Sequence, residues 1–550
     1  MAAPTMTAAR TGPDMGIRIG VGFVLLLPAL IALAWSYLLP TLQAVSRSTK
    51  RDRLIGPVES VGSANYEGLF AQGFLGDMGS ALLLALVPLA LALLVAPALA
   101  LLADRAGRRA RLALRALVVL PVAGYAPVAL LIGWRLDRME PGTMLDRPVA
   151  TLAELTAVTG AGLVVAVATT AFLSTLRGRG QRRDALPAAL TVAGLLVLGI
   201  IAAALQTYTA PLLTGRIRTP LTYAVTESLQ QMNLGGGSAA AVLLLIPLAL
   251  LGLAATALLL LTRVRIEVVD EAVTHREHPE DAVSKSGPVT ESGPATGSTG
   301  NRQARIGLAV AGALVFVVML WVAWPWLRRS LRFTTETVPM PAPDLGGMLT
   351  ATWLPTLLSA MVTVAVAAAA GFAIGGLRPL GRFSELLLLP FAPWLFVGTG
   401  PLAIESFLRA RDLEQLNTFL GLVPPGWVSI PALFLFTVLF RGLEPRWRAG
   451  GGFWSTMLAP AAPMVVLVGL VTWLVAAAQV LWPMLVASTP TYRPAPLEAL
   501  SGFARWGMRG DGDGLALGAV LPLPMMLIFL AVFVLLQVKY LDRLTVRVGR

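Results

Sequence analysis

The chain has 550 residues, of which 56% are hydrophobic and 13% charged, and its mean hydropathy is +0.74. Soluble globular proteins have about a quarter of their residues charged. This composition therefore excludes a soluble enzyme, a secreted disulfide scaffold and a disordered protein, and it makes membrane lipid the solvent for much of the chain. The net charge is +13 and cysteine is absent, so disulfides, thiolate metal sites and cysteine nucleophiles are excluded as well.

A membrane-spanning helix needs roughly 20 apolar residues. The sequence predicts an all-α polytopic membrane protein of about twelve such helices, six in each half of the chain. In chain order they are expected near Ile17–Leu39, Ala81–Ala103, Ala116–Trp134, Leu155–Leu173, Ala189–Tyr208, Ala239–Leu261, Ile306–Trp326, Leu354–Gly375, Leu386–Ile404, Phe419–Phe440, Ala461–Val486 and Leu515–Val538.

The two halves, 1–265 and 305–550, are separated by a polar segment, 266–304. Its run SKSGPVTESGPATGSTG is rich in Gly, Ser, Pro and Thr and poor in apolar residues, so it is expected to be a flexible tether. If both termini and this linker are cytoplasmic, the whole excess of positive charge falls on the cytoplasmic side, as the positive-inside rule requires. The basic balance then needs no nucleic acid, and a bacterial plasma membrane is the expected location.

The two halves also resemble each other in sequence. The fifth span of each half begins with a proline (Pro187 and Pro460), holds a glutamine deep in the span (Gln206 and Gln479) and ends near a second proline (Pro211 and Pro483). Since six spans separate equivalent positions, both halves have the same orientation. The pattern indicates a parallel repeat about an axis along the membrane normal.

The sequence predicts no enzyme activity, no cofactor and no metal site. There is no GxxxxGK[ST], no HExxH and no CxxC, and both histidines (His275 and His278) lie in the linker. Almost no ionisable residue lies deep within a predicted span. The one that comes nearest to doing so is Glu405, at the end of the ninth span. This argues against a proton-driven relay. A pathway for a neutral polar solute remains open, with polar and aromatic candidates at Gln206, Tyr208, Thr209, Trp473, Gln479 and Trp482. Each of these side chains could instead be an interfacial anchor or a helix-to-helix contact.

One segment resembles the major facilitator superfamily of secondary carriers. ADRAGRRARL at Ala103–Leu112 has the Asp, Arg and Gly spacing of the cytoplasmic signature between the second and third spans of that family. The equivalent loop of the second half, GGLRPLGRF at Gly375–Phe383, lacks the Asp-Arg pair. A twelve-helix secondary carrier of this kind stays open as an alternative.

A second resemblance covers nearly the whole chain. Each half resembles a permease subunit of the binding-protein-dependent ABC importers, the maltose-type sugar permeases in particular. The first half carries ANYEGLF from Ala64 and a basic loop followed by a proline-broken helix that ends in Trp-Arg at Arg135. The second half carries LEQLNTFLGLVPP from Leu413, QVLWPMLVAS from Gln479 and a final helix with its tail from Leu521. The chain thus looks like two fused permease subunits.

The resemblance implies a translocation subunit for a sugar or oligosaccharide, with an extracytoplasmic solute-binding protein and a separate ABC ATPase as partners. In that family a Glu-Ala-Ala loop docks on the ATPase, and here the motif is degenerate in both halves. The first loop reads STLRGRGQRRDALP and the second RGLEPRWRAGGGFWSTMLAP. If an ATPase still couples, the candidate contacts are Arg177, Arg179, Arg182, Arg183, Arg441, Glu444, Arg446 and Arg448. A permease-like protein that has lost coupling and serves as a membrane partner or scaffold is the other alternative.

Overall fold

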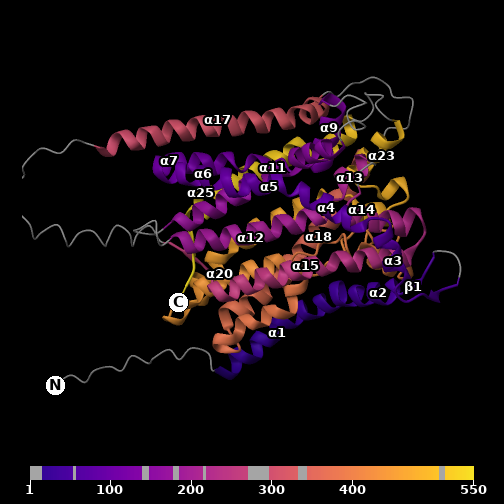
Figure 1. Cartoon of the computed structure of the whole chain (residues 1–550). Coiled ribbons are helices and arrows are strands. Elements are labelled where there is room, and N and C mark those ends of the chain that lie inside the picture. Colours follow the sequence, from indigo (N-terminus) through magenta and orange to yellow (C-terminus); the bar gives the residue numbers. More distant parts are fainter. Residues whose placement is uncertain are drawn as a thin grey trace, which may run out of the picture.

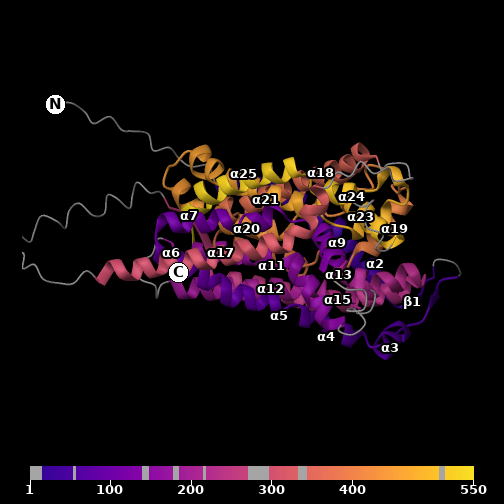
Figure 2. The same cartoon turned by 90° about the horizontal axis from the view of Figure 1, so that it is seen from above.

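The computed structural model describes residues 15–53, 57–138, 148–177, 185–214, 218–269, 296–331, 344–506 and 514–549. These residues form a bundle of long helices that run along a common direction (Figures 1 and 2). One end of the bundle carries the short hairpin β1–β2, and we call it the hairpin end. The C-terminal tail lies at the opposite end, where α17 also begins, and we call this the linker end (Figure 1).

The first half is almost entirely helical. Its elements are α1 (Met15–Leu33), η1 (Ala34–Leu38), α2 (Leu39–Ser48), β1 (Lys50–Arg51), β2 (Glu59–Ser60), α3 (Ala64–Ala71), α4 (Phe74–Leu84), α5 (Leu86–Ala90), η2 (Leu91–Val95), α6 (Ala96–Ala106), α7 (Arg108–Leu117), α8 (Leu120–Ala123), α9 (Pro127–Arg138), α11 (Pro148–Leu176), α12 (Leu186–Leu205), α13 (Thr209–Thr214), α14 (Pro220–Val225), η4 (Thr226–Gln230), α15 (Leu234–Thr262) and β3 (Arg265–Val268).

The second half is also almost entirely helical. Its elements are α17 (Thr296–Leu331), α18 (Leu345–Phe372), η5 (Ala373–Leu377), η6 (Gly381–Trp394), α19 (Ala403–Asp412), α20 (Ile430–Arg448), η7 (Trp454–Leu458), α21 (Ala459–Ala477), α22 (Leu481–Val486), η8 (Pro490–Tyr492), α23 (Ala495–Trp506), α24 (Gly514–Val520), α25 (Leu523–Lys539), η9 (Leu541–Arg543) and β4 (Leu544–Arg547).

The chain is a multi-pass membrane protein. Nine helices among the described residues are long and apolar enough to cross a membrane, or ten if the bent pair 108–123 and 127–137 is one span. The expected ninth and tenth stretches do not form single helices: 386–404 contains the end of the 3₁₀ helix η6 and an irregular segment, and α20 begins only at Ile430. Prolines explain both departures, because Pro390, Pro393 and Pro401 in one and Pro424 and Pro425 in the other cannot donate helical hydrogen bonds.

The two halves share one core. Leu26 of α1 lies in the same buried cluster as Val364 of α18 and Leu433 of α20. Gly371 and Gly375 form a Gly-x-x-x-Gly pair on the face of α18 and η5 that meets α20. A Cβ atom at Gly375 would overlap the carbonyl oxygen of Thr437. Small residues at this spacing allow helix backbones to approach closely within a membrane.

A two-stranded ribbon joins the halves at the linker end. β3, which follows the last helix of the first half, pairs antiparallel with β4, which follows the last helix of the second half, in the register Arg265 to Arg547 and Val268 to Leu544. The segment expected to be a flexible linker is therefore structured at both edges, since Ile266–Val268 belong to β3 and α17 begins at Thr296. Residues 270–295 lie outside the described part of the chain.

The fifth predicted spans break at equivalent positions. α12 spans 20 residues from a proline near its start, and the six-residue α13 follows after Gln206–Tyr208. α21 spans 19 residues, also with a proline near its start, and the six-residue α22 follows after Ala478–Val480. The glutamines that matched in sequence thus occupy the two breaks.

Candidate functional site

The breaks in the fifth spans meet an irregular segment of the second half. This segment, residues 395–402, connects the end of η6 at Trp394 with the start of α19 at Ala403. It contains Gly398, Gly400 and Pro401, which favour neither a helix nor a strand. Gly398 is exposed although its neighbours Val397 and Leu402 are buried. Non-helical backbone at membrane depth is tolerated where protein buries it or where it lines a water-filled cavity.

Gln206 binds this segment directly. Its Nε2 donates to the carbonyl oxygens of Ala202 (2.9 Å) and Phe396 (2.8 Å), and its Oε1 accepts a hydrogen bond from the backbone N–H of Gly398 (2.8 Å). A side chain of the first half thereby satisfies backbone groups that the irregular segment of the second half leaves without helical partners.

Gln479 reaches the neighbouring residue. The hydroxyl of Thr399 donates to Oε1 of Gln479 across 3.3 Å. Gln206 and Gln479, which are equivalent in the sequence repeat, therefore contact consecutive residues of one segment. The structure brings these two predicted site residues together.

The other four pathway candidates contact other parts of the chain. The Tyr208 hydroxyl donates to the Met484 sulfur at 3.6 Å, and Thr209 begins α13 beside it. Trp473 donates its indole N–H to the carbonyl oxygen of Trp353 (2.9 Å) and packs edge-on against that ring. Trp482 is buried and donates to the carbonyl oxygen of Gly421 (3.0 Å).

Both tryptophans thus use their polar atom within the protein. Such contacts are the helix-to-helix alternative that the sequence left open, and Trp473 and Trp482 fit this alternative better than a solute site.

The candidate coupling residues of the second half contact the chain itself. Arg441 pairs with Glu385 at 2.7 Å, and the largely buried Glu444 pairs with Arg448 and, at 3.9 Å, with Arg378. After Arg448 the chain makes only a turn, with Gly450 at a φ of 95°, before η7 begins at Trp454.

The ribbon covers this segment. Arg446 donates to the carbonyl oxygen of Val268 in β3 at 2.6 Å, and a Cβ atom at Gly442 would overlap the carbonyl oxygen of Ile266. The backbones of α20 and β3 are therefore in direct contact where the ABC resemblance expects an ATPase to dock.

Arg177, which opens the first-half coupling loop, is held by η9 and by β4, the other strand of the ribbon. Arg177 donates to the carbonyl oxygen of Asp542 (2.6 Å) and to its carboxylate, while the Thr545 hydroxyl donates to the carbonyl oxygen of Arg177 (2.9 Å). Arg111 and Arg115 of α7 also pair with the Asp542 carboxylate, at 2.9 and 3.2 Å. The remaining candidates, Arg179, Arg182 and Arg183, lie outside the described residues.

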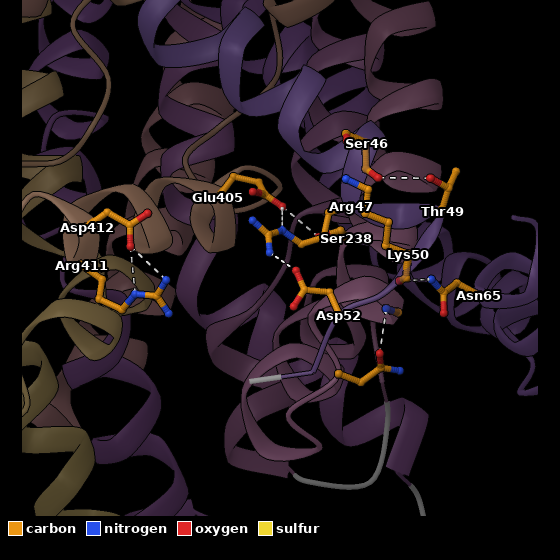
Figure 3. Close-up of polar contacts among 12 residues, drawn as sticks. Ser46, Arg47, Thr49, Lys50, Asp52, Asn65, Ser238, Glu405, Arg411 and Asp412 are labelled. Atoms are coloured by element: carbon orange, nitrogen blue, oxygen red, sulfur yellow. Dashed lines mark hydrogen bonds and ion pairs between the residues drawn. The ribbon is translucent and has the colours of Figure 1, made fainter. Parts of the chain in front are cut away.

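A second polar network joins the halves at the hairpin end (Figure 3). Glu405 of α19 is 3% exposed, and its carboxylate accepts hydrogen bonds from Arg47 of α2 (3.2 Å) and from Ser238 of α15 (2.9 Å). Arg47 also pairs with Asp52. Burial raises the pKa of the Glu405 carboxyl above its ordinary value, and the Arg47 charge and the two hydrogen bonds oppose that rise.

Sequence reasoning singled out Glu405 but none of its partners, and it missed Asp542 with Arg111 and Arg115. Arg111 entered only as part of the segment Ala103–Leu112 that resembles the carrier signature, and Arg115 only as part of a basic loop. The available signal was the presence of single acidic residues close to apolar helices, because a carboxylate buried there needs a cationic partner.

Comparison with family models, with curated proteins and with solved structures finds no match for this chain.

Proposed function

We propose that the chain is the membrane-spanning permease component of an ABC-type importer. The solute is a sugar or oligosaccharide that an extracytoplasmic binding protein delivers, and a separate ATPase supplies the energy. The linker end faces the cytoplasm of a bacterial plasma membrane, and the hairpin end faces outward. The twelve-span arrangement in two parallel repeats is part of this proposal.

One observation carries it: Gln206 and Gln479 meet at Phe396–Thr399. Substrate sites of transporters are commonly formed where discontinuous helices from two repeats come together. Here both fifth spans break at the glutamines, and the segment between them is irregular and exposed at Gly398. The ribbon also supports the proposal. Its two antiparallel strands, β3 and β4, each follow the last helix of one half, as expected if a pseudo-two-fold axis along the bundle relates the halves.

The chemistry of the site suits hydroxyl-rich neutral solutes. Side-chain amides donate and accept hydrogen bonds, as sugar hydroxyls do. The amide of Gln206 already bonds the backbone groups of Phe396 and Gly398, so a solute that reaches Gly398 can exchange hydrogen bonds with it. No charged side chain takes part in these contacts.

The test is uptake by cells that carry Gln206→Ala or Gln479→Ala. Each variant is expected to slow uptake of the transported solute about tenfold, the loss that corresponds to about one hydrogen bond. Gln303→Ala is the matched control, because Gln303 is exposed on α17. Uptake that both glutamine variants leave at the control level would contradict a solute site at these residues.

A second candidate function is a permease-like protein without ATP-driven transport. It is favoured by the contacts of Arg446 with β3 and of Arg177 with β4, because the ribbon then lies against a residue of each coupling segment. Affinity purification from the native membrane decides between the two. An ATPase that co-purifies, and that is lost when Arg446 and Arg448 are changed to Glu, supports the importer. If no ATPase accompanies the unchanged protein under conditions that preserve membrane complexes, the uncoupled function is correct.

A further inference from the structure

An apolar cavity lies within the membrane-spanning part of the bundle, away from the two glutamines. Its volume is about 390 Å³, which is within the range of small-molecule pockets. It is partly open, and its walls come from η2, the α8–α9 bend, α11, α17 and α25, including Val95, Pro121, Tyr125, Ala161, Met319 and Trp326.

The backbone keeps this space open. The helix pair 108–123 and 127–137 bends by 81° beside it, which turns α9 away from α8. On the opposite wall α11 presents the small residues Ala157, Ala161 and Gly162. A Cβ atom at Gly162 would lie 2.6 Å from the Cβ of Pro121, so these two elements are already in contact. The cavity is therefore a consequence of helix geometry and not of a single side-chain rotamer.

The surroundings of the cavity identify its occupant. α17 carries exposed apolar side chains, among them Val310, Leu314 and Val317, as expected of a helix that faces lipid. An apolar cavity excludes water, because water there lacks hydrogen-bond partners. Since the cavity is partly open and α17 forms one of its walls, the lipid acyl chains that lie against α17 are the apolar molecules closest to the cavity.

The dimensions agree with one leaflet. The α17 wall runs from Leu314 to Leu327, about 20 Å at about 1.5 Å per residue. This is somewhat more than half of a hydrocarbon core about 30 Å thick. Beyond Leu327 come charged residues, and Arg328 pairs with Asp137 of α9. Polar groups thus mark the level where the headgroup region begins.

We propose that this cavity binds one acyl chain of a membrane phospholipid from the leaflet at the hairpin end. The chain lies between α11 and α17, and the headgroup stays at the level of Arg328. Because α9 and α11 belong to the first half and α17 and α25 to the second, the bound lipid fills a gap between the halves. The proposal does not depend on the transported solute or on an ATPase.

The experiment uses the whole purified chain in nanodiscs that contain a phosphatidylglycerol with a photoreactive diazirine in the middle of one acyl chain. After illumination, peptide mapping is expected to place most of the label on 157–163 and 319–323. Ala161→Phe places a large side chain in the cavity and is expected to lower this label about tenfold. The reason is that each methylene group of the acyl chain that is displaced from the cavity loses its buried contact. Ala309→Phe, on an exposed position of α17, is the matched control and retains it.

Ala157→Leu is a smaller change in the same wall, and it serves if Ala161→Phe fails to fold. Label spread evenly over the exposed face of α17, or equal labelling of Ala161→Phe and Ala309→Phe, would show ordinary annular lipid and overturn the proposal. So would retention of a soluble apolar probe by the cavity with no lipid label inside it.

Discussion

Arg115 and Asp542 form an ion pair between the halves, with Arg115 Nε 3.2 Å from Asp542 Oδ1. Arg115 is 0% exposed and Asp542 is 3% exposed. Arg111 and Arg177 pair with the same carboxylate, so the Asp542 carboxylate faces three cations. Removing one partner of a buried pair leaves an uncompensated charge, which costs more than an exposed pair ever contributes.

Asp542→Asn is therefore expected to destabilise the protein by about 3–5 kcal/mol. The measurement is thermal unfolding of the purified protein in detergent. Asp412→Asn is the matched control: Asp412 is 66% exposed beside Arg411, and such a pair contributes about 0–1 kcal/mol. Equal unfolding temperatures for the two variants would show that Asp542 does not stabilise the junction of the halves.

The shared core and the ribbon predict that the covalent linker is dispensable. Two fragments made by splitting the gene between Gly287 and Ser292, when co-expressed, should associate and co-purify, because contacts such as Arg177 with Asp542 and β3 with β4 do not need the linker. Adding Glu267→Pro, which removes the backbone donor that faces Thr545 two residues before the Val269 N–H that donates to Arg543, should weaken co-purification. Fragments that insert into the membrane but fail to associate would contradict this prediction.

Glu405 predicts a pH dependence of stability. Its pKa in the folded state is raised above the ordinary value of 4.5, mainly because burial disfavours the charged carboxylate. The Arg47 charge and the Ser238 hydroxyl oppose this rise, and the Asp52 charge adds to it. Arg409 is a further charged neighbour. A raised folded-state pKa means that the folded protein binds this proton more tightly than the unfolded chain, so stability from this group rises as pH falls toward 4.5.

As the pH is lowered from 7 to 4.5, the ordinary pKa of the group, the unfolding temperature of the unchanged protein should therefore rise relative to that of Glu405→Gln. Glu59→Gln, in a pair with both side chains 57% exposed, is the control and should show no such trend. A difference between wild type and Glu405→Gln that is constant with pH would refute the assignment.

The orientation is tested with single cysteines. Ser60 is exposed on β2, which pairs with β1 at the hairpin end, while β3 pairs with β4 next to the C-terminus, at the opposite end (Figure 1). An impermeant maleimide should label Ser60→Cys in intact cells and label Ser292→Cys only after permeabilisation. The chain has no cysteine of its own, so background labelling is absent. The reverse pattern would invert the topology.

Composition and periodicity predict the long apolar helices well, because lipid requires them whatever their neighbours are. They fail at 386–404 and 419–440, where the residues are apolar but closely spaced prolines and glycines prevent a straight span. The polar residues Gln206 and Gln479 stand out in the sequence because the residues around them in the same spans are apolar. Their common partner could not be predicted, because Phe396–Thr399 becomes a partner only through the folding of a different segment.

The ribbon also has a consequence for biosynthesis. The carbonyl of Arg177 and the Thr545 hydroxyl that binds it are 368 residues apart in sequence. At about 5–20 residues per second, a ribosome needs about 20–70 s to make the intervening chain. During that time Arg115 lacks its carboxylate, and β3, once it has been made, has an open pairing edge until β4 follows. Unpaired edges and exposed apolar surfaces invite wrong partners, so the nascent first half is the stage at which insertion factors and proteases have the best access to this protein.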